Sequence, residues 1–141
     1  MSFKKLITKK AEFSASHRYW NPNWDEDKNR EVFGKNTSPL GHGHNFHLEV
    51  TVEGEIDENT GMVINLFDLK DILGAVLERY DHKYLNEDLE EFSSVIPTPE
   101  NIAKQLWNDI ESELTSRNTQ CKLYKVRLYE TPDLFVDYWK S

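Results

Sequence analysis

The chain has a single cysteine, Cys121, among its 141 residues, and it has no apolar run of the length that crosses a membrane. One thiol cannot form an internal disulfide, which excludes a disulfide-stapled scaffold and favours a reducing compartment. Cys121 is most simply a small apolar residue at the start of a strand. The segment from Met1 to Leu6 also lacks the apolar core of a signal peptide. We therefore predict a cytoplasmic protein with no membrane partner.

Basic residues are also scarce, with 17 Lys and Arg against 25 Asp and Glu, which gives a net charge of -8. Nucleic acids and anionic membranes attract clustered Lys and Arg, so this composition argues against both as partners. A small anionic substrate is compatible with this net charge if the protein has a local basic pocket. Glycine and proline number only 6 and 5, and no repeat, low-complexity segment or linker divides the chain. Residues 1–141 are therefore expected to form a single domain that can bury a core.

Hydrophobic periodicity predicts both strands and helices. We expect strands at 3–16, 46–53, 62–64, 123–129 and 134–139, and helices at 65–80 and 98–114. Asn65 and Thr98 have side chains that cap helices, and Pro99 suits the first helical position. Residues 18–41 are expected to be largely irregular, with a solvated loop or a short helix at 25–31. This order predicts an α+β fold in which two helices cover one face of a mostly antiparallel sheet.

Two histidines stand two residues apart in Gly41-His42-Gly43-His44, where an alternating β pattern begins. Side chains at i and i+2 of a strand leave the same face, so His42 and His44 can reach one metal ion, whereas His47 points to the other face. His17, at the end of another strand-like run, is the candidate third ligand. Three neutral imidazoles with an open fourth position are typical of catalytic zinc, although imidazole also suits iron, copper and nickel. The alternative is three unrelated polar residues, because His-x-His arises easily.

Two further patterns carry possible chemistry. Asp81-His82 follows the first predicted helix and offers a proton relay if other residues orient the ring, although such a dipeptide is more often a solvated loop. Glu130 shares strand parity with Val126 and Leu128, so its carboxylate is expected to face the apolar side, where an unpaired charge is costly. A ligand with two adjacent N–H groups would satisfy both of its oxygens. An internal Arg, a backbone turn or water would serve as well.

Seven motifs, in order along almost the whole chain, resemble those of a known family. They are Phe33-Gly34-Lys35, Gly41 to Phe46, Gly61-Met62-Val63, Leu66 to Lys70, Asp81-His82-Lys83, Thr98 to Asn101, and Tyr129-Glu130-Thr131. With these motifs the chain resembles the family of 6-pyruvoyl tetrahydropterin synthase and 6-carboxytetrahydropterin synthase. The resemblance implies that His17, His42 and His44 hold Zn²⁺.

The resemblance also implies roles for residues around the metal. Asp81 and His82 would belong to the catalytic relay. Glu130 would anchor the pterin ring through its amino and N3 hydrogens, with Thr98 and Glu100 beside the pocket. The implied fold is the tunnelling fold, in which four-stranded antiparallel sheets from three subunits join into a β-barrel. Two such trimers would stack as a homohexamer with sites between subunits.

The implied reaction converts 7,8-dihydroneopterin triphosphate to 6-pyruvoyl tetrahydropterin, with loss of triphosphate and no external redox cofactor. One position departs from the family. Its catalytic cysteine stands six residues before the first histidine of the His-Gly-His motif, and here that residue is Asn36. An amide is no base at neutral pH, and neither Thr37 nor Ser38 supplies a thiol or carboxylate. Three interpretations follow: a 6-pyruvoyl-type lyase, a 6-carboxytetrahydropterin synthase or folate-branch side-chain-cleaving enzyme on the same substrate, and a non-catalytic pterin-binding protein.

Overall fold

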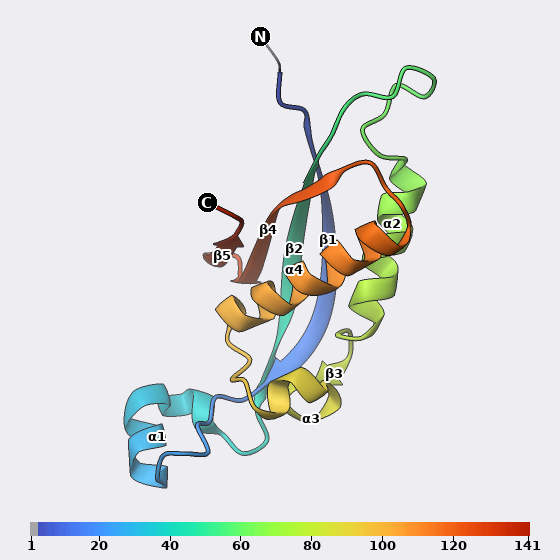
Figure 1. The fold of residues 1–141 in the computed structure, drawn as a ribbon. Coiled ribbons are helices and arrows are strands. Elements are labelled where there is room, and N and C mark those ends of the chain that lie inside the picture. The colour runs from blue at the N-terminus through green and yellow to red at the C-terminus, as the bar shows by residue number, and fades with distance from the viewer. Residues whose placement is uncertain (1–2) are drawn as a thin grey trace.

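The computed structural model describes residues 3–141, and its centre is a curved five-stranded sheet with the order β3-β1-β2-β4-β5 (Figure 1). The antiparallel strands are β1 (Leu6–His17), β2 (His42–Glu53), β4 (Lys122–Thr131) and β5 (Leu134–Tyr138). The fifth strand, β3 (Lys83–Tyr84), pairs in parallel with the end of β1. The predicted four-stranded antiparallel sheet is thus confirmed, and β3 extends it at one edge. Two residues are too few to give a periodic signal.

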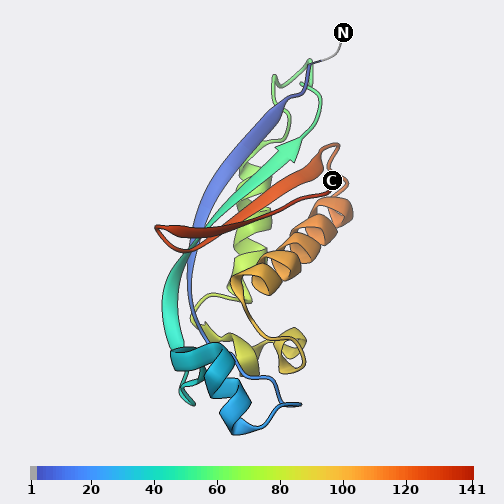
Figure 2. The ribbon, with the colours of Figure 1, turned by 90° about the vertical axis from the view of Figure 1, so that its left-hand side faces the viewer.

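Two long helices, α2 (Leu66–Glu78) and α4 (Pro99–Ser116), cover one face of the sheet (Figure 2). Their caps are the predicted ones, because Asn65 Oδ1 accepts from the Phe67 amide at 2.9 Å and Thr98 Oγ1 accepts from the Asn101 amide at 3.2 Å. Alternate residues of β2 face the helices and are fully buried, namely Phe46, Leu48, Val50 and Val52. Burying each such side chain stabilises the fold by about 1.5–3 kcal/mol. The core therefore lies between this face and the two helices.

Two details of the predicted pattern are wrong. Residues 62–64 form no strand, because the carbonyl of Met62 accepts from the Asp57 amide within a turn and no strand runs beside them. Their apolar side chains still serve the core, since Ile64 is buried. The helical spacing of apolar residues predicts that Leu66 belongs to the buried stripe of α2, but Leu66 is exposed, because it lies at the first position of the helix, ahead of the part that packs on the sheet.

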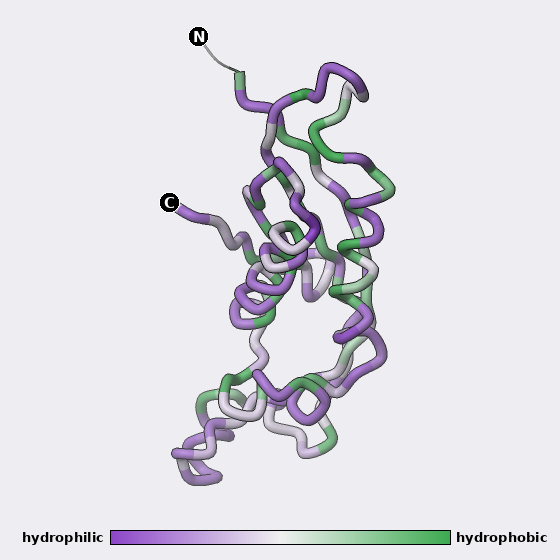
Figure 3. Tube along the Cα trace, turned by 45° about the vertical axis from the view of Figure 1, so that its right-hand side comes forward, coloured by the Kyte–Doolittle hydropathy of each residue, from purple (hydrophilic) through white to green (hydrophobic). Residues whose placement is uncertain are grey.

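The segment between β1 and β2 is more ordered than its composition predicts. It contains α1 (Glu26–Phe33) and the 3-10 helix η1 (Gly34–Thr37), and its hydrophilic character is visible in Figure 3. The fully buried Asn29 holds it together, since its amide donates to the carbonyls of Asn21 and Asp25 and its oxygen accepts from the Asn21 amide. The remaining short elements are α3 (Leu85–Asp88) and η2 (Glu90–Ser93). Across residues 3–141, every helix is too short or too polar to cross a membrane.

Candidate metal centre

Three histidines converge at the end of the sheet where β1 stops and β2 begins. The Cα atoms of His17 and His42 are direct partners in the antiparallel register, and His44 pairs with Ala15 two positions along. One nitrogen from each ring lies within 4.8 Å of the other two. The predicted i, i+2 pair and the predicted third histidine therefore form one cluster, while His47 is exposed on the opposite face. The interpretation of three unrelated polar residues is wrong.

The ring of His17 is oriented to offer one nitrogen to a metal. Its Nδ1 lies 2.7 Å from the carbonyl oxygen of Pro97. A carbonyl can only accept, so Nδ1 carries the proton and Nε2 carries the free lone pair. That Nε2 atom and Nε2 of His44 are buried with no hydrogen-bond partner in the described part of the chain. Buried atoms of this kind are costly, and a metal ion between them would remove the cost. The three residues therefore fit a metal.

The electrostatics of the cluster favour the uncharged rings that ligate metals. The pKa of His17 is lowered to about 4, mainly by burial, with a smaller contribution from the other two imidazoles, while the hydrogen bond to Pro97 opposes the shift. Burial is also the main reason why the pKa values of His42 and His44 are lowered. All three rings are thus neutral at pH 7, and protons compete little for their lone pairs.

Glu130 lies at the end of β4 and faces this cluster, as strand parity predicts. Its carboxylate oxygens lie 3.8 Å from His17 Nε2 and 3.7 Å from His44 Nε2. The side chain is 13% exposed, and burial raises the pKa of its carboxyl group. No Arg or Lys pairs with it in the described residues, and Oε2 has no hydrogen-bond partner there. The internal arginine considered from the sequence is absent, so the carboxylate is an acceptor directed at the metal side of the pocket.

The first turn of α4 borders the same pocket. Thr98 is the N-cap residue of the helix and follows Pro97, whose carbonyl holds His17. Glu100 is exposed in the first helical turn, and its charge adds to the effect of burial, which raises the pKa values of both Glu130 and Tyr19. The structure therefore brings both predicted pocket residues to the rim of the site. Because the hydroxyl of Thr98 caps the helix, its role toward a ligand stays a prediction.

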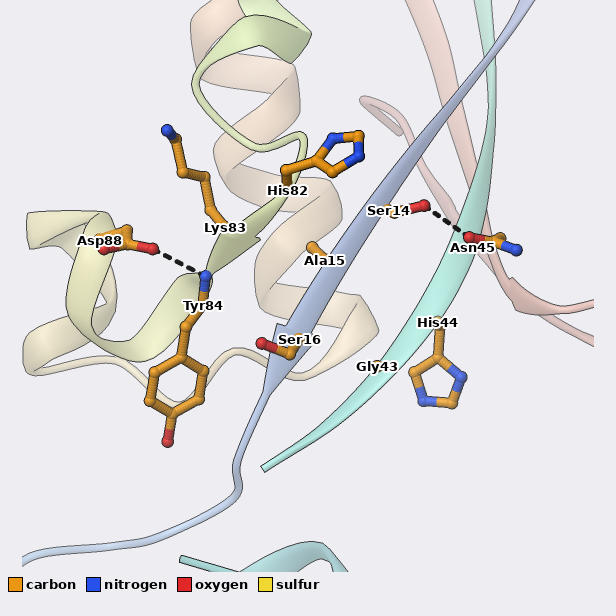
Figure 4. Close-up of a pocket in the computed structure, with 10 residues that line it drawn as sticks. All are labelled: Ser14, Ala15, Ser16, Gly43, His44, Asn45, His82, Lys83, Tyr84 and Asp88. Carbon is orange, nitrogen blue, oxygen red and sulfur yellow. Dashed lines mark hydrogen bonds between the residues drawn. The ribbon is translucent and has the colours of Figure 1, made fainter. Parts of the chain in front are cut away.

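Asp81 and His82 form a contact pair, but they do not reach the three histidines of their own chain. His82 Nδ1 lies 3.0 Å from Asp81 Oδ2, and the backbone amide of Ser14 donates to Asp81 Oδ1 at 2.8 Å. The side chain of His82 is 83% exposed, and the backbone of this residue has a positive φ of 63°. Figure 4 shows His82 on one side of β1 and His44 on β2 at the other side, within the lining of a hollow of about 620 Å³. The pair is thus presented at the outer edge of the sheet.

Asn36, the position where the family has its cysteine, lies in η1 and is half-buried. Its carbonyl accepts from the amide of Tyr19 at 2.8 Å. The ring of Tyr19 in turn meets His17 edge-on, with centroids 5.3 Å apart, and lies 6.5 Å from the ring of His42. One backbone hydrogen bond and one side chain therefore connect Asn36 to the histidine cluster.

Two contributors to the site have little signal in the sequence. Pro97 acts through its backbone carbonyl, which any residue would carry. Tyr19 is one of several aromatic residues in the segment 18–41, yet its hydroxyl faces Glu130, and burial with that carboxylate raises the pKa of the phenol. Only the fold of residues 18–41 over the end of the sheet brings Tyr19 to the carboxylate.

The fold and the site define an α+β protein with a cluster of three histidines that fits a metal ion, beside a buried carboxylate. The family model described as 6-pyruvoyl tetrahydropterin synthase matches residues 6–141. The chain belongs to this family.

Similar proteins span nearly the same length. The 6-pyruvoyl tetrahydrobiopterin synthase of Pongo abelii is 42% identical over 133 residues, which are 94% of this chain and 89% of that protein. The protein of the same name from Drosophila melanogaster is 41% identical over 134 residues, 94% of this chain and 78% of the relative. The structure of Caenorhabditis elegans 6-pyruvoyl tetrahydropterin synthase superposes with a TM-score of 0.90 at 34% identity, covering 98% of this chain and 96% of that one.

Proposed function

We propose that the protein is a zinc-dependent pterin lyase that converts 7,8-dihydroneopterin triphosphate to 6-pyruvoyl tetrahydropterin, with elimination of triphosphate. The observation that carries the proposal is the buried Glu130 carboxylate, 3.7–3.8 Å from two unpartnered imidazole nitrogens of a three-histidine cluster. This arrangement offers an acceptor for a ring with paired N–H groups next to a site for a Lewis acid. Relatives named for this synthase, at 41–42% identity, support it.

The chemistry divides between the metal and the side chains. Zinc, when bound by His17, His42 and His44, would polarise oxygens of the substrate side chain and acidify the neighbouring C–H bonds. Glu130 would accept hydrogen bonds from the pterin amino group and N3–H, which fixes the ring and holds the side chain at the metal. Burial of this pocket strengthens each of these electrostatic interactions.

The proton relay would come from a neighbouring subunit. Asp81 is fixed by the Ser14 amide and contacts His82 Nδ1, so the imidazole is oriented with its other nitrogen free. Because this pair lies at the sheet edge and outside its own histidine cluster, it is placed to act on the pocket of an adjacent chain. In a homohexamer built from two trimers, the edges of β1 and β5 would pair between subunits. This pairing would bring the Asp81–His82 pair of one subunit to the histidine cluster of another.

Asn36 favours a second candidate, an enzyme of the same family that makes another product. An amide in the position of the catalytic thiol can hydrogen-bond a substrate but cannot take up its proton. Relatives with other names support this alternative more weakly. They include a putative 6-carboxy-5,6,7,8-tetrahydropterin synthase of Archaeoglobus fulgidus, 40% identical over 96 residues, and a dihydroneopterin monophosphate aldolase of Pyrococcus furiosus, 31% identical over 134.

Product analysis separates the candidates. The zinc-loaded protein is incubated with 7,8-dihydroneopterin triphosphate, and the pterins are separated and identified by mass spectrometry. The lyase gives 6-pyruvoyl tetrahydropterin and triphosphate, whereas the alternatives give a 6-carboxy or a shortened product. His82→Ala is the matched control, because its exposed side chain is dispensable for the fold and its loss should stop the reaction without releasing the metal. If the pterin binds but no product forms, the protein is a non-catalytic pterin-binding protein.

A further inference from the structure

Buried polar atoms without partners gather at one point of the molecule. The residues described contain four such side-chain atoms, and three of them are His17 Nε2, His44 Nε2 and Glu130 Oε2. They face one another, with Glu130 Oε2 3.8 Å from His17 Nε2 and Glu130 Oε1 3.7 Å from His44 Nε2. No Lys or Arg side chain pairs with Glu130 among the described residues. The carboxylate is therefore left without a cation.

The same distances are nearly those between ligands of one metal ion. Zinc bonds to nitrogen and oxygen are about 2.0–2.2 Å long, so neighbouring ligand atoms in a tetrahedral site lie roughly 3.3–3.5 Å apart. The Glu130 oxygens are only a few tenths of an ångström farther from the two nitrogens than that. A small side-chain rotation, well within the freedom of a glutamate at a strand end, would bring one oxygen to the fourth coordination position.

We propose that Glu130 has two alternative partners: it closes the metal site as a fourth ligand while no pterin is bound, and it leaves the metal when the ring takes hold of its carboxylate. The proposal rests on the proposed function, because it requires that a pterin binds at Glu130. Arrival of the ring would then open the coordination position that the substrate side chain needs. The metal is accessible only when the substrate is correctly seated.

The chemistry of the carboxylate makes this exchange feasible. Two parallel N–H donors on a ring match both carboxylate oxygens, and charge-assisted hydrogen bonds of this kind are about twice as strong as neutral ones. The hydroxyl of Tyr19 also faces this carboxylate, so Tyr19 is an additional partner in either state. The buried carboxylate therefore has enough partners when it binds either the metal or the pterin ring. With neither of them bound, its oxygens lack partners, which is costly.

Cobalt spectroscopy tests ligation directly. Co²⁺ replaces zinc in the metal-free protein, and its visible d–d bands report coordination number and ligand type. We expect the spectrum of Glu130→Gln to differ clearly from that of the wild type with no pterin present. Glu100→Gln is the matched control, because it removes an equal charge from the pocket rim without removing a ligand, and it should leave the bands unchanged. Identical bands in the wild type and Glu130→Gln overturn the proposal.

Linkage tests the exchange without any mutation. The probe is 6-methylpterin, which carries the ring N–H groups but no side-chain hydroxyl, and its Kd is measured on metal-free and zinc-loaded protein. If zinc competes for Glu130, the metal-free protein binds the ring about 5- to 150-fold more tightly, the usual range for coupled sites. Equal affinity, or tighter binding to the zinc form, overturns the exchange while leaving the pterin site intact. Absence of binding to both forms contradicts the proposed function itself, and with it the exchange.

Discussion

The Nδ1–H group of His17 donates to the carbonyl of Pro97 at 2.7 Å, and this bond joins the metal cluster on the sheet to the start of helix α4. The side chain of His17 is completely buried, so the contact is shielded from water. The bond fixes the tautomer of the His17 ring, and it also fixes the distance between β1 and the start of α4. The proposed metal ligand His17 is therefore also part of the packing of the domain.

From this contact we predict that the three histidines differ in their effect on stability. With a chelator present, His17→Ala should lower the free energy of unfolding by about 1–3 kcal/mol, because it leaves the Pro97 carbonyl unpaired in a buried place. His42→Ala should change it by less than about 0.5 kcal/mol, since that ring is half-buried and has no such bond. Both variants should lose zinc when analysed by elemental analysis. Full zinc content in His42→Ala and His44→Ala would contradict the assignment of the ligands.

The sequence was sufficient to predict the parts of this site that follow from periodicity. Strand parity put His42 and His44 on one face and Glu130 on the buried side, and the cap residues located the start of both long helices. These signals are local, so they need no knowledge of the fold. The third candidate ligand, His17, was predicted from its place at a strand end, and the antiparallel register puts it opposite His42.

Other features depend on contacts between distant residues and could not be predicted in this way. The carbonyl of Pro97 is 80 positions from His17 along the chain. Every residue has a backbone carbonyl, so the type of the residue does not indicate this contact. The same holds for β3, which is a strand only because the edge of β1 is there to pair with it. Conversely, the apolar run at 62–64 looked like a strand, yet it lies at a turn and does not pair with the sheet.

A second prediction concerns the ring anchor. Glu130→Gln should weaken binding of a pterin such as biopterin by roughly tenfold or more, because the amide presents a donor toward the donors of the ring and a mismatched buried pair costs about 1–3 kcal/mol. Isothermal titration with metal-free protein measures this without interference from zinc. The control is Glu58→Gln, which removes an exposed carboxylate beyond the end of β2 that lies far from the histidines. If Glu130→Gln binds biopterin as tightly as the wild type does, the pterin ring binds in another pocket.

A third prediction concerns assembly. In the described part of the chain, β5 has a neighbour on one side only, and β1 is paired by β3 over just two residues. Leu134, Phe135 and Trp139 lie exposed at or next to β5. Such edges are usually covered or paired, so we expect a homohexamer of about 100 kDa from chains of 16.6 kDa, measured by light scattering. A monomer at micromolar concentration would exclude both the barrel and a shared site.

The shared site gives a fourth prediction. His42→Ala removes a proposed metal ligand and His82→Ala removes the proposed relay, so each variant alone should be inactive. If the two groups come from different subunits, dissociating and reassembling an equal mixture should restore activity in about a quarter of the sites, those that combine an intact metal ligand with an intact relay. Reassembly of each variant by itself is the control. No recovery from a mixture of confirmed hexamers would place the relay and the metal in the same chain.

The final prediction addresses Asn36, which stands where the family has its catalytic cysteine and is connected to the histidine cluster through Tyr19. If the protein is a 6-pyruvoyl-type lyase without its usual base, wild-type turnover should be slow and Asn36→Cys should increase it. A thiolate beside zinc and imidazole is a competent base at neutral pH, and a general base typically contributes about 10²–10⁴-fold.

Asn36→Ser separates a base from a smaller side chain, because serine matches cysteine in size but is not deprotonated at neutral pH, and it should give no gain. The rate of 6-pyruvoyl tetrahydropterin formation is compared at equal zinc content and equal oligomeric state. If the Asn36 amide instead binds the substrate of another reaction, the cysteine variant loses that activity and forms no pyruvoyl product. That result would exclude the lyase and support the carboxy-type or side-chain-cleaving enzyme, because only a substrate contact explains loss of activity when a better base is introduced.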